Sequence, residues 1–356
     1  MTIEELAQII GVSRVTLSKV INGAGGVAPK TEARIREYIE KYNFEPNSSA
    51  RSLVGKEEPV IGLFSAFTKS NDGAGEEITS HFGTELINLV VDEAQKCGYN
   101  TLVHLTQGST DIRSLERILG RKLVQGAILV GYDTGNEEIA GIISRGYPLV
   151  LINQERRSTA ANMAVVNMGD KSAAFEAVEK MVAGGHRRLL YIGCNRSRLA
   201  AMRRAEGVHE AVERYSADID SLSEIDGDFN EEKTYNAVKA LYAGVSVDRA
   251  KALRELPTGI FAANDIMAIG AMNALKELGI RIPDEVSIIG HDDIQIARYI
   301  SPSLTTMRCD FRNIASVCVN TLVGMIKKEA PQREVELPSV YIERETFSSA
   351  QERPDK

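Results

Sequence analysis

From Pro59 onward, short apolar segments alternate with longer amphipathic segments. The apolar segments have strand length, and the amphipathic ones repeat their apolar residues at helical spacing. Strands that are apolar throughout, with helices between them, indicate parallel sheets covered on both faces. Roughly 300 residues of this pattern suffice for about two doubly wound α/β domains. The predicted strands are Val60–Phe64, Thr101–Leu105, Ala127–Val130, Leu149–Ile152, Leu189–Ile192, Gly259–Ala262 and Val286–Ile289, and the predicted helices are Phe82–Cys97, Ile112–Lys122, Lys171–Val182, Leu199–Arg214, Glu231–Leu241, Ile266–Leu278 and Arg312–Lys328.

Polar residues follow several of these strands. In doubly wound sheets, ligands bind beyond the carboxyl ends of the strands, so these positions are candidates for ligand contact. Most of them are amides or carboxylates, which suit hydroxyls and ring nitrogens, and none is an obvious nucleophile. The residues are Ser65, Phe67, Asn153, Gln154, Asn264, Asp265, His291, Asp292 and Asp293.

The familiar catalytic motifs do not accompany these residues. The chain has no G-x-S-x-G elbow, no G-x-x-x-x-G-K-[ST] loop and no G-x-G-x-x-G fingerprint after a strand. Asp292 and Asp293 are adjacent at a strand end, where neighbouring side chains point apart, so they do not form a shared-proton pair. The five histidines show no ligand-like spacing. We therefore predict no catalytic residue, no metal site and no cofactor.

The first residues of the chain predict two short helices joined by a tight turn. Thr2 caps the first helix, and Glu5 completes a capping box. Gly11 ends that helix, and Ser13 caps a second one. The second helix has Leu17, Val20 and Ile21 on its apolar side, and its other side carries the donors Arg14, Thr16, Ser18, Lys19 and Asn22. This pattern is typical of a helix-turn-helix whose second helix enters the DNA major groove, with a plain helical hairpin as the alternative.

A third helix is predicted at Thr31–Tyr42 before Pro46 ends the head. The segment 47–55 that follows has two interpretations. It is either a flexible linker or a short helix that orders only on DNA. In the second case Asn47 caps it, Ala50 and Leu53 share one face, and Arg51 reaches phosphate.

The net charge of the N-terminal head differs from that of the rest of the chain, which indicates that the two parts have different functions. The chain has 42 Lys and Arg against 49 Asp and Glu, a net charge of −7. Residues 1–56 hold eight basic and six acidic residues, a net +2, which leaves −9 for the rest. A mildly basic head on an acidic body fits a DNA-binding unit attached to another domain.

The cysteines and the hydropathy pattern indicate a cytoplasmic protein. The four cysteines, Cys97, Cys194, Cys309 and Cys318, are scattered and form no C-x-x-C pair, so we expect reduced thiols. No apolar run approaches the length that spans a membrane. Glu4 and Glu5 interrupt the N-terminus, which does not resemble a secretory signal.

These segments together resemble the lactose/galactose repressor (LacI/GalR) family of bacterial transcription regulators. Residues 2–53 resemble the family's DNA-binding head almost position for position. Each body motif is weak alone, but their shared order is specific. They are Gly185-His186-Arg187-Arg188, Arg204-x-x-Gly207, Phe261-Ala262-Ala263-Asn264-Asp265, Met267-Ala268-Ile269-Gly270, Gly279-Ile280 before Ile282-Pro283, Ile289-Gly290-His291-Asp292-Asp293 and Pro302-Ser303-Leu304-Thr305-Thr306.

The resemblance implies an α/β fold with a three-helix helix-turn-helix head, a hinge helix and a periplasmic-binding-protein-like core of two doubly wound subdomains. The implied boundaries are 1–46 for the head, 47–57 for the hinge, 58–345 for the core and 346–356 for a tail. Within the core, the N-subdomain takes about 58–164 and 308–332, and the C-subdomain takes about 165–307 and 333–345.

The resemblance also implies how the head meets DNA. Arg14, Val15 and Lys19 occupy positions that face bases, where valine suits a thymine methyl and a cation suits guanine. Thr16, Ser18 and Asn22 hold phosphates and set the register, and Thr2 and Ser13 belong to the same surface. Asn47, Ala50, Arg51 and Leu53 form the hinge helix, with Leu53 of each subunit wedged into the minor groove.

For the core, the resemblance implies a ligand site with Arg204, Asn264 and Asp292 as its polar contacts. Phe229 matches an aromatic that packs on the ligand, Asn153 stands where a carboxylate is usual, and Phe311 floors the pocket. For each of these residues, packing between subdomains or a cap at a strand end is the alternative. Arg198, six residues before Arg204, shows a spacing found in purine-type members.

The chain departs from the family in three places. The segment Phe67–Ser80 is longer, glycine-rich and acidic, and we expect a surface loop in preference to a lid. His81-Phe82-Gly83 stands where Pro-Phe-Phe is common, so Phe82 remains while one aromatic wall is missing. No leucine heptad follows Arg344, which favours a homodimer over a coiled-coil tetramer.

The resulting hypothesis is a repressor that reads a pseudo-palindromic double-stranded operator and responds to a small-molecule effector. A carbohydrate effector is favoured, and a purine or another metabolite acting as corepressor is the alternative. A sugar-binding transport protein is a weaker alternative, because it needs a signal peptide and no DNA-binding head. An enzyme on the same fold is the other weaker alternative.

Overall fold

The computed structural model describes residues 1–21, 24–42, 44, 59–67, 81–107, 112–132, 137–194, 198–246, 249 and 254–349. The chain divides into two compact units, Met1–Pro59 and Val60–Lys356, which are described separately. In the part of the chain so described, no helix is both long enough and apolar enough to cross a membrane.

The first unit is a bundle of three short helices, α1 (Ile3–Ile10), α2 (Arg14–Ile21) and α3 (Pro29–Lys41). The predicted capping box is confirmed, since Thr2 N donates to Glu5 Oε2 at 2.8 Å and Glu5 N donates to Thr2 Oγ1 at 3.2 Å. Gly11 ends α1 with a φ of 72°, the left-handed conformation that favours glycine. The buried apolar core is small: Leu6, Ala7, Ile10, Leu17, Val20, Ile35 and Phe44.

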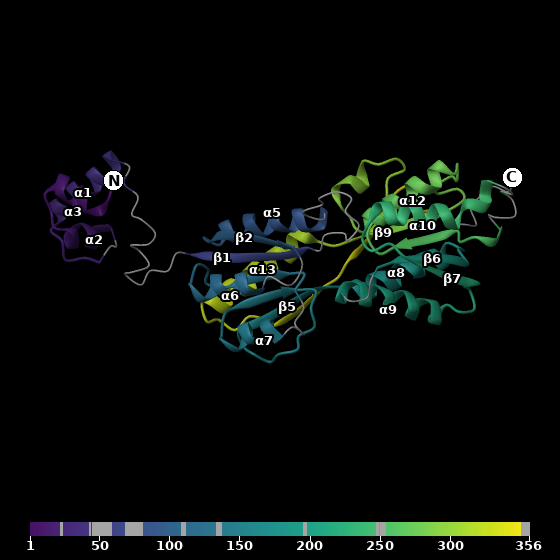
Figure 1. Ribbon diagram of the computed structural model, residues 1–356, viewed down its shortest axis with the longest axis horizontal. Coiled ribbons are helices and arrows are strands. Elements are labelled where there is room, and N and C mark those ends of the chain that lie inside the picture. Colours follow the sequence, from purple (N-terminus) through teal and green to yellow (C-terminus); the bar gives the residue numbers. More distant parts are fainter. Residues whose placement is uncertain are drawn as a thin grey trace. The chain divides into compact units, whose positions relative to one another are not determined.

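The second unit contains two six-stranded sheets (Figure 1). The first sheet is parallel throughout. Helices α5 (His81–Lys96) and α13 (Phe311–Ile326) cover one face, whereas α6 (Ile112–Gly120) and α7 (Glu137–Ser144) cover the other. Its strands in spatial order are β11 (Glu334–Leu337), β5 (Met163–Met168), β4 (Leu149–Ile152), β3 (Ala127–Val130), β1 (Val60–Phe67) and β2 (Asn100–Gln107).

The second sheet is parallel except for its edge strand β12, which runs antiparallel to β10. Helices α8 (Asp170–Ala183) and α9 (Leu199–Arg214) pack as one pair, and α10 (Glu231–Leu241) and α12 (Asp265–Glu277) as another. Two short 3-10 helices, η1 (Ala243–Ser246) and η2 (Gln295–Arg298), also belong to this second subdomain. In spatial order the strands are β12 (Val340–Ile342), β10 (Thr305–Arg308), β9 (Ser287–Asp292), β8 (Gly259–Ala262), β6 (Arg188–Gly193) and β7 (Ser221–Asp226).

The chain passes between the two sheets three times, at residues 168–170, 308–311 and 337–340, which we call the crossovers. The crossovers contact one another. Gly169 N donates to Leu337 O at 2.8 Å, and Cys309 Sγ lies 3.5 Å from Ser339 Oγ. Any rotation of one sheet subdomain against the other must therefore pass through these three segments.

The structure corrects the predicted boundaries inside the core. Strand β5 continues to Met168, and β11 pairs in parallel with β5, so residues 165–168 and 334–337 belong to the first sheet. The predicted tail also begins too early, because Thr346 is fully buried and its backbone oxygen accepts from Ile288 N at 2.8 Å. The strands β5, β7, β10, β11 and β12 and the helix α7 were not predicted.

Candidate ligand site and nucleic-acid interface

The outward face of α2 carries the predicted DNA contacts. Leu17 and Val20 are buried in the head, whereas Arg14, Val15 and Lys19 are exposed. Val15 is 65% exposed and lies outside the core of the head, so its methyl groups are available to a partner. Arg14 Nη1 pairs with Glu4 at 2.9 Å, so in the unbound head its guanidinium is held by α1.

Ser13 begins this helix by capping it. Thr16 N donates to Ser13 Oγ at 3.0 Å, and the two hydroxyls are 2.8 Å apart. Thr16 and Ser18 are partly buried at the base of the exposed face. The predicted contacts Asn22, Asn47, Ala50, Arg51 and Leu53 lie outside the described residues, as does the segment 68–80.

In the core, a buried charge cluster lies at the carboxyl ends of the second sheet. We use this term for Asp170, Arg204 and Asp292. Arg204 is 4% exposed on α9, its Nε donates to Asp170 Oδ1 at 2.7 Å, and its Nη1 donates to Ala263 O. Its Nη2 lies 3.7 Å from Asp292 Oδ1, which makes an ion pair without a short hydrogen bond.

Burial and mutual attraction oppose each other in this cluster. Burial disfavours the charged guanidinium of Arg204, but the attraction of Asp170 and Asp292 outweighs it and raises the arginine pKa. Burial also raises the pKa of Asp170, and Arg204 opposes that rise. Burial raises the pKa of Asp292 to about 7, with Arg204 lowering it and Asp170 raising it further. The charge on Asp292 therefore changes near neutral pH.

Asp292 and Asp293 point to different partners. Both have positive φ, 114° and 61°, which is strained for residues other than glycine and is often found at functional sites. Asp293 accepts from Arg308 Nε at 2.6 Å, from Arg298 Nη2 at 3.3 Å and from Arg344. The prediction that the two carboxylates do not share a proton is consistent with this divergence.

The side-chain oxygens of the two predicted amides, Asn264 and Asn153, each accept a hydrogen bond from a backbone N–H. Asn264 Oδ1 accepts from Met267 N at 2.8 Å and caps α12. Asn153 Oδ1 accepts from Met168 N at 2.9 Å and joins β4 to β5. A cap at a strand end was the alternative role for both residues, and each still has its amide nitrogen and one lone pair of Oδ1 to offer a ligand.

Asp265, next to Asn264, is an internal anchor. Its Oδ1 accepts from Thr306 Oγ1 at 2.6 Å, and its Oδ2 accepts from Ile294 N at 2.9 Å. An added Cβ at Gly290 would lie 2.2 Å from Asp265 Oδ1, so β9 needs glycine beside this carboxylate. Burial first and then Asp292 raise the pKa of Asp265 well above its usual value.

Of the remaining predicted contacts, the structure brings two together. The guanidinium of Arg198, just before α9, lies over the Phe229 ring at 5.4 Å from its centroid. Phe229 follows β7 in the left-handed region, with a φ of 57°. Phe311 is buried at the start of α13, in the apolar core of the first subdomain. Phe82 lies in α5, and its side chain is outside the described set.

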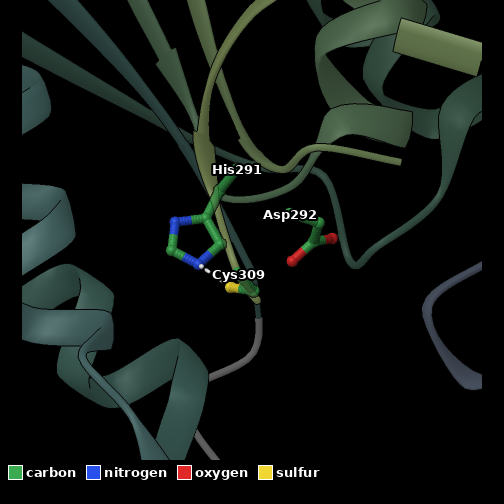
Figure 2. A group of neighbouring side chains, drawn as sticks. All are labelled: His291, Asp292 and Cys309. Carbon is green, nitrogen blue, oxygen red and sulfur yellow. Dashed lines mark hydrogen bonds between the residues drawn. The ribbon is translucent and has the colours of Figure 1, made fainter. Parts of the chain in front are cut away.

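The sequence did not predict that Asp170 and Cys309 would lie in this site. Asp170 pairs with Arg204 across 34 positions, and it reads in sequence only as an acidic residue at a helix start. Cys309 lies 3.4 Å from His291 Nε2 across 18 positions (Figure 2). His291, Asp292 and Cys309 form a group that could hold a metal ion, although the histidine spacing gave no such signal.

Comparison with known proteins identifies the family. Residues 2–47 match the bacterial regulatory proteins of the lacI family, and residues 178–347 match a periplasmic binding protein-like domain. A probable HTH-type transcriptional repressor, ExuR of Bacillus subtilis (strain 168), is 30% identical over 336 residues, which cover 94% of each chain. The chain belongs to the LacI family. HTH-type transcriptional repressor PurR of Vibrio atlanticus (strain LGP32) is 29% identical over 352 residues, covering 98% of this chain and 99% of the relative.

Solved structures share the fold of this LacI-family chain. A lac repressor dimer bound to operator and the anti-inducer ONPF has a TM-score of 0.82 at 23% identity, covering 97% of this chain and 98% of the other. A complex of the regulator CelR with cellobiose has a TM-score of 0.67 at 20% identity, covering 98% and 100%. The predicted fold class, a helix-turn-helix head and two parallel-sheet subdomains, is confirmed. The chain is a LacI-family transcriptional repressor.

Proposed function

We propose that this repressor binds a near-palindromic operator as a homodimer and is controlled by a sugar or sugar derivative held between its two sheet subdomains. The buried charge cluster carries the effector half of this proposal. A planar guanidinium donates in a fork that matches neighbouring hydroxyls, and the carboxylates accept from them. The cluster lies beyond the carboxyl ends of parallel strands, where such folds bind ligands.

The same cluster is joined to the crossovers. Asp170 ends the crossover 168–170, and Asp292 O accepts from Cys309 N, in the crossover 308–311, at 3.2 Å. An effector that contacts Asp170 or Asp292 therefore acts on the segments through which the subdomains rotate. The coupling must be reciprocal, so an effector that weakens operator binding is itself bound more weakly by the operator complex.

The exposed side of α2 supports the DNA half. Arg14 and Lys19 present cations beside the exposed Val15, a combination that suits guanine acceptors next to a thymine methyl group. In this proposal Thr16, Ser18 and Asn22 hold phosphates, and residues 47–57 form the hinge helix with Leu53 in the minor groove. A symmetric dimer places two such heads on two half-sites.

A sugar is favoured over a planar base, although one contact supports the alternative. Solved relatives hold cellobiose, ribose and D-xylulofuranose, which supports a carbohydrate. In contrast, Arg198 over Phe229 forms a flat surface that would also take a purine ring. A purine that strengthens operator binding would make the protein a corepressed regulator of the same family.

A ligand screen separates these alternatives. We would measure the melting temperature of the full chain with sugars, sugar phosphates, nucleosides and purines, because a ligand that binds only the native state raises it by mass action. Each hit is then titrated against operator DNA by fluorescence anisotropy. A sugar that lowers DNA affinity supports the proposal, and a purine that raises it supports the alternative. If no compound of any class raises the melting temperature, the assignment of the cluster to small-molecule binding is contradicted.

The DNA half has its own matched test. Arg14→Ala should weaken specific operator binding by about 1–3 kcal/mol if Arg14 reads a base edge. Arg36→Ala is the control, because Arg36 lies on α3 and pairs with Glu32 at 2.7 Å. Anisotropy at one salt concentration measures both variants, since phosphate contacts depend on salt. Equal affinities of the two variants would contradict a reading role for α2.

A further inference from the structure

Three potential metal ligands meet beside the crossovers. His291 and Asp292 end β9, and Cys309 lies in the crossover 308–311. All three are buried, and their ligand atoms lie within 4.8 Å of one another. Figure 2 shows the imidazole and the carboxylate on either side of the thiol. The three groups come from two neighbouring strand ends, so the sheet itself fixes their separation.

The distance between nitrogen and sulfur already suits a tetrahedral cation. His291 Nε2 lies 3.4 Å from Cys309 Sγ. Bonds of about 2.3 Å from zinc to sulfur and about 2.0 Å to nitrogen place the two ligand atoms roughly 3.5 Å apart. The carboxylate of Asp292 must move inward by roughly 1 Å to complete three ligands. A small side-chain rotation therefore assembles the site.

Hydrogen bonding leaves these groups able to coordinate. Arg204 donates its short hydrogen bonds to Asp170 and to the backbone oxygen of Ala263. Its contact with Asp292 is a longer ion pair of 3.7 Å. His291 Nδ1 has no hydrogen-bond partner among the described residues. Its Nε2 lies 3.4 Å from Cys309 Sγ and 3.5 Å from Asp170 Oδ1, and a cation bound at Nε2 would replace these two longer contacts.

The local charges also balance a divalent ion. With Cys309 as a thiolate, the charges of Asp170, Asp292 and Cys309 against that of Arg204 leave a net charge of −2. A divalent cation reduces this to zero, which removes much of the cost of burying separate charges. Thiolate and imidazole ligands select zinc and similar transition metals over magnesium or calcium, which prefer oxygen.

We propose that His291, Asp292 and Cys309 form a site for a thiophilic divalent cation of the zinc class. On binding, the thiol of Cys309 releases its proton to solvent, and the sulfur bonds to the metal. A fourth position remains for water or for an oxygen of another ligand. Because the thiol also contacts Ser339 in a second crossover, the cation ties β9 to the segments that join the subdomains. This site stands without the proposed effector, although both use Asp292.

Cobalt(II) reports on such a site directly, because it replaces zinc and colours thiolate complexes. We would titrate the reduced full chain with Co²⁺, without DNA or sugar, and then compete with Zn²⁺. The expected result is one equivalent with visible ligand-field bands and a thiolate charge-transfer band. Cys309→Ser should abolish the charge-transfer band, and His291→Asn should weaken binding at least tenfold.

Two control variants separate this site from adventitious binding. Cys318→Ser removes another fully buried thiol, in the core of the first subdomain. His209→Asn removes an exposed imidazole that pairs with Glu224 at 2.6 Å. Both should bind Co²⁺ as the wild type does. A charge-transfer band that persists in Cys309→Ser, or one lost in Cys318→Ser, would overturn the assignment.

X-ray absorption of the zinc-loaded wild type tests the site without any variant that fails to fold. The site predicts one sulfur ligand, with nitrogen and oxygen as the others. A shell of nitrogen and oxygen alone, or failure of the wild type to retain zinc on desalting, would refute it. Neither result bears on the sugar proposal, whose test contains no metal.

Discussion

The two sheet subdomains are built alike but bury different chemistry. Among the residues that the structure describes, the first subdomain buries no carboxylate, imidazole or cationic side chain. Its buried polar groups are the hydroxyls of Ser65, Ser114 and Thr321, beside tyrosines and cysteines of its apolar clusters. The second buries several ionisable groups at its strand ends: Asp170, Arg204, Asp265, His291, Asp292 and Asp293. Buried charge is costly unless it is paired, so its concentration on one side is a feature that stability alone does not explain. This concentration of buried charge is the reason for proposing that the effector binds to the second subdomain.

The largest expected effect comes from removing the guanidinium of Arg204 from the buried charge cluster. Arg204→Ala leaves Asp170 and Asp292 buried without their positive partner, and we expect the free energy of unfolding to fall by about 3–5 kcal/mol. Urea unfolding at pH 7 measures this loss. Arg203→Ala is the neighbouring control, because Arg203 is 43% exposed and pairs with Glu206 at 3.0 Å on the surface. A similar loss in both variants would show that the second subdomain does not depend on its buried charge.

A core substitution in the first subdomain should behave differently. Leu86→Ala removes a buried side chain from the apolar cluster of α5 and α13, and we expect a loss of about 3 kcal/mol from the lost contacts and the cavity. Burial raises the pKa of its ionisable members Tyr99, Cys309 and Cys318, so none of them should change charge between pH 5 and pH 8, and the loss should be the same at both values. A loss that changes between these pH values would mean that the first core is coupled to the charge cluster.

The pH dependence of stability should trace to Asp292. Burial raises the pKa of Asp292 from 3.8 to about 7 in the folded chain. The folded state therefore holds a proton that the unfolded state releases, and the stability gained from this is full below the unfolded pKa and lost as the pH rises towards 7. Asp292→Asn cannot titrate, so its stability relative to wild type should rise by about 3 kcal/mol between pH 4 and pH 7.

Urea unfolding at several pH values between 4 and 7.5 measures this difference. The free energy of unfolding of Asp292→Asn minus that of the wild type should increase across the range. A difference that stays constant would show that Asp292 does not carry the raised pKa. Asp265 is present in both proteins, but Asp292 contributes to its raised pKa, so the pKa of Asp265 should be lower in Asp292→Asn than in the wild type.

The smallest expected effect comes from Asn264→Ala, which tests whether Asn264 only caps α12 or also contacts the effector. Asn264→Ala should cost about 1 kcal/mol, because it removes the cap of α12. Asn230 caps α10 in the same way, accepting from Lys233 N at 2.7 Å, so Asn230→Ala should cost a similar amount. Thermal unfolding compares the two, and effector titration then distinguishes them. If Asn264 also contacts the effector, only its variant binds more weakly.

The sequence predicted the alternation of strands and helices because central strands are apolar on both faces. It missed β7 and β11 because edge strands are half exposed, and Glu334–Leu337 alternates charged and apolar residues. Strand β12 is only three residues long. Periodicity within a segment cannot identify such strands, because their pairing partners lie far away in the chain.

The candidate site was also only partly predictable from the sequence. Positions at strand ends were visible, but contacts between distant segments were not. Asp292 ends β9 and Asn264 lies two residues after β8, so their position at a strand end was visible in the sequence. Arg204 was assigned from the family resemblance. Its pairing with Asp170 was not predictable, since helices α8 and α9 bring these two residues together only through tertiary packing. The contact of His291 with Cys309 depends in the same way on the pairing of β9 with β10.

The most direct test of the account is effector-dependent operator binding by wild type and Asp292→Asn. Fluorescence anisotropy would give the operator affinity of each protein with and without the sugar that most raises the melting temperature of the wild type. We expect equal operator affinity of the two proteins without sugar, a fall in the affinity of the wild type when the sugar is added, and at least a tenfold weaker response for Asp292→Asn. An unchanged sugar response in Asp292→Asn would contradict the claim that the charged strand ends of the second subdomain bind the effector.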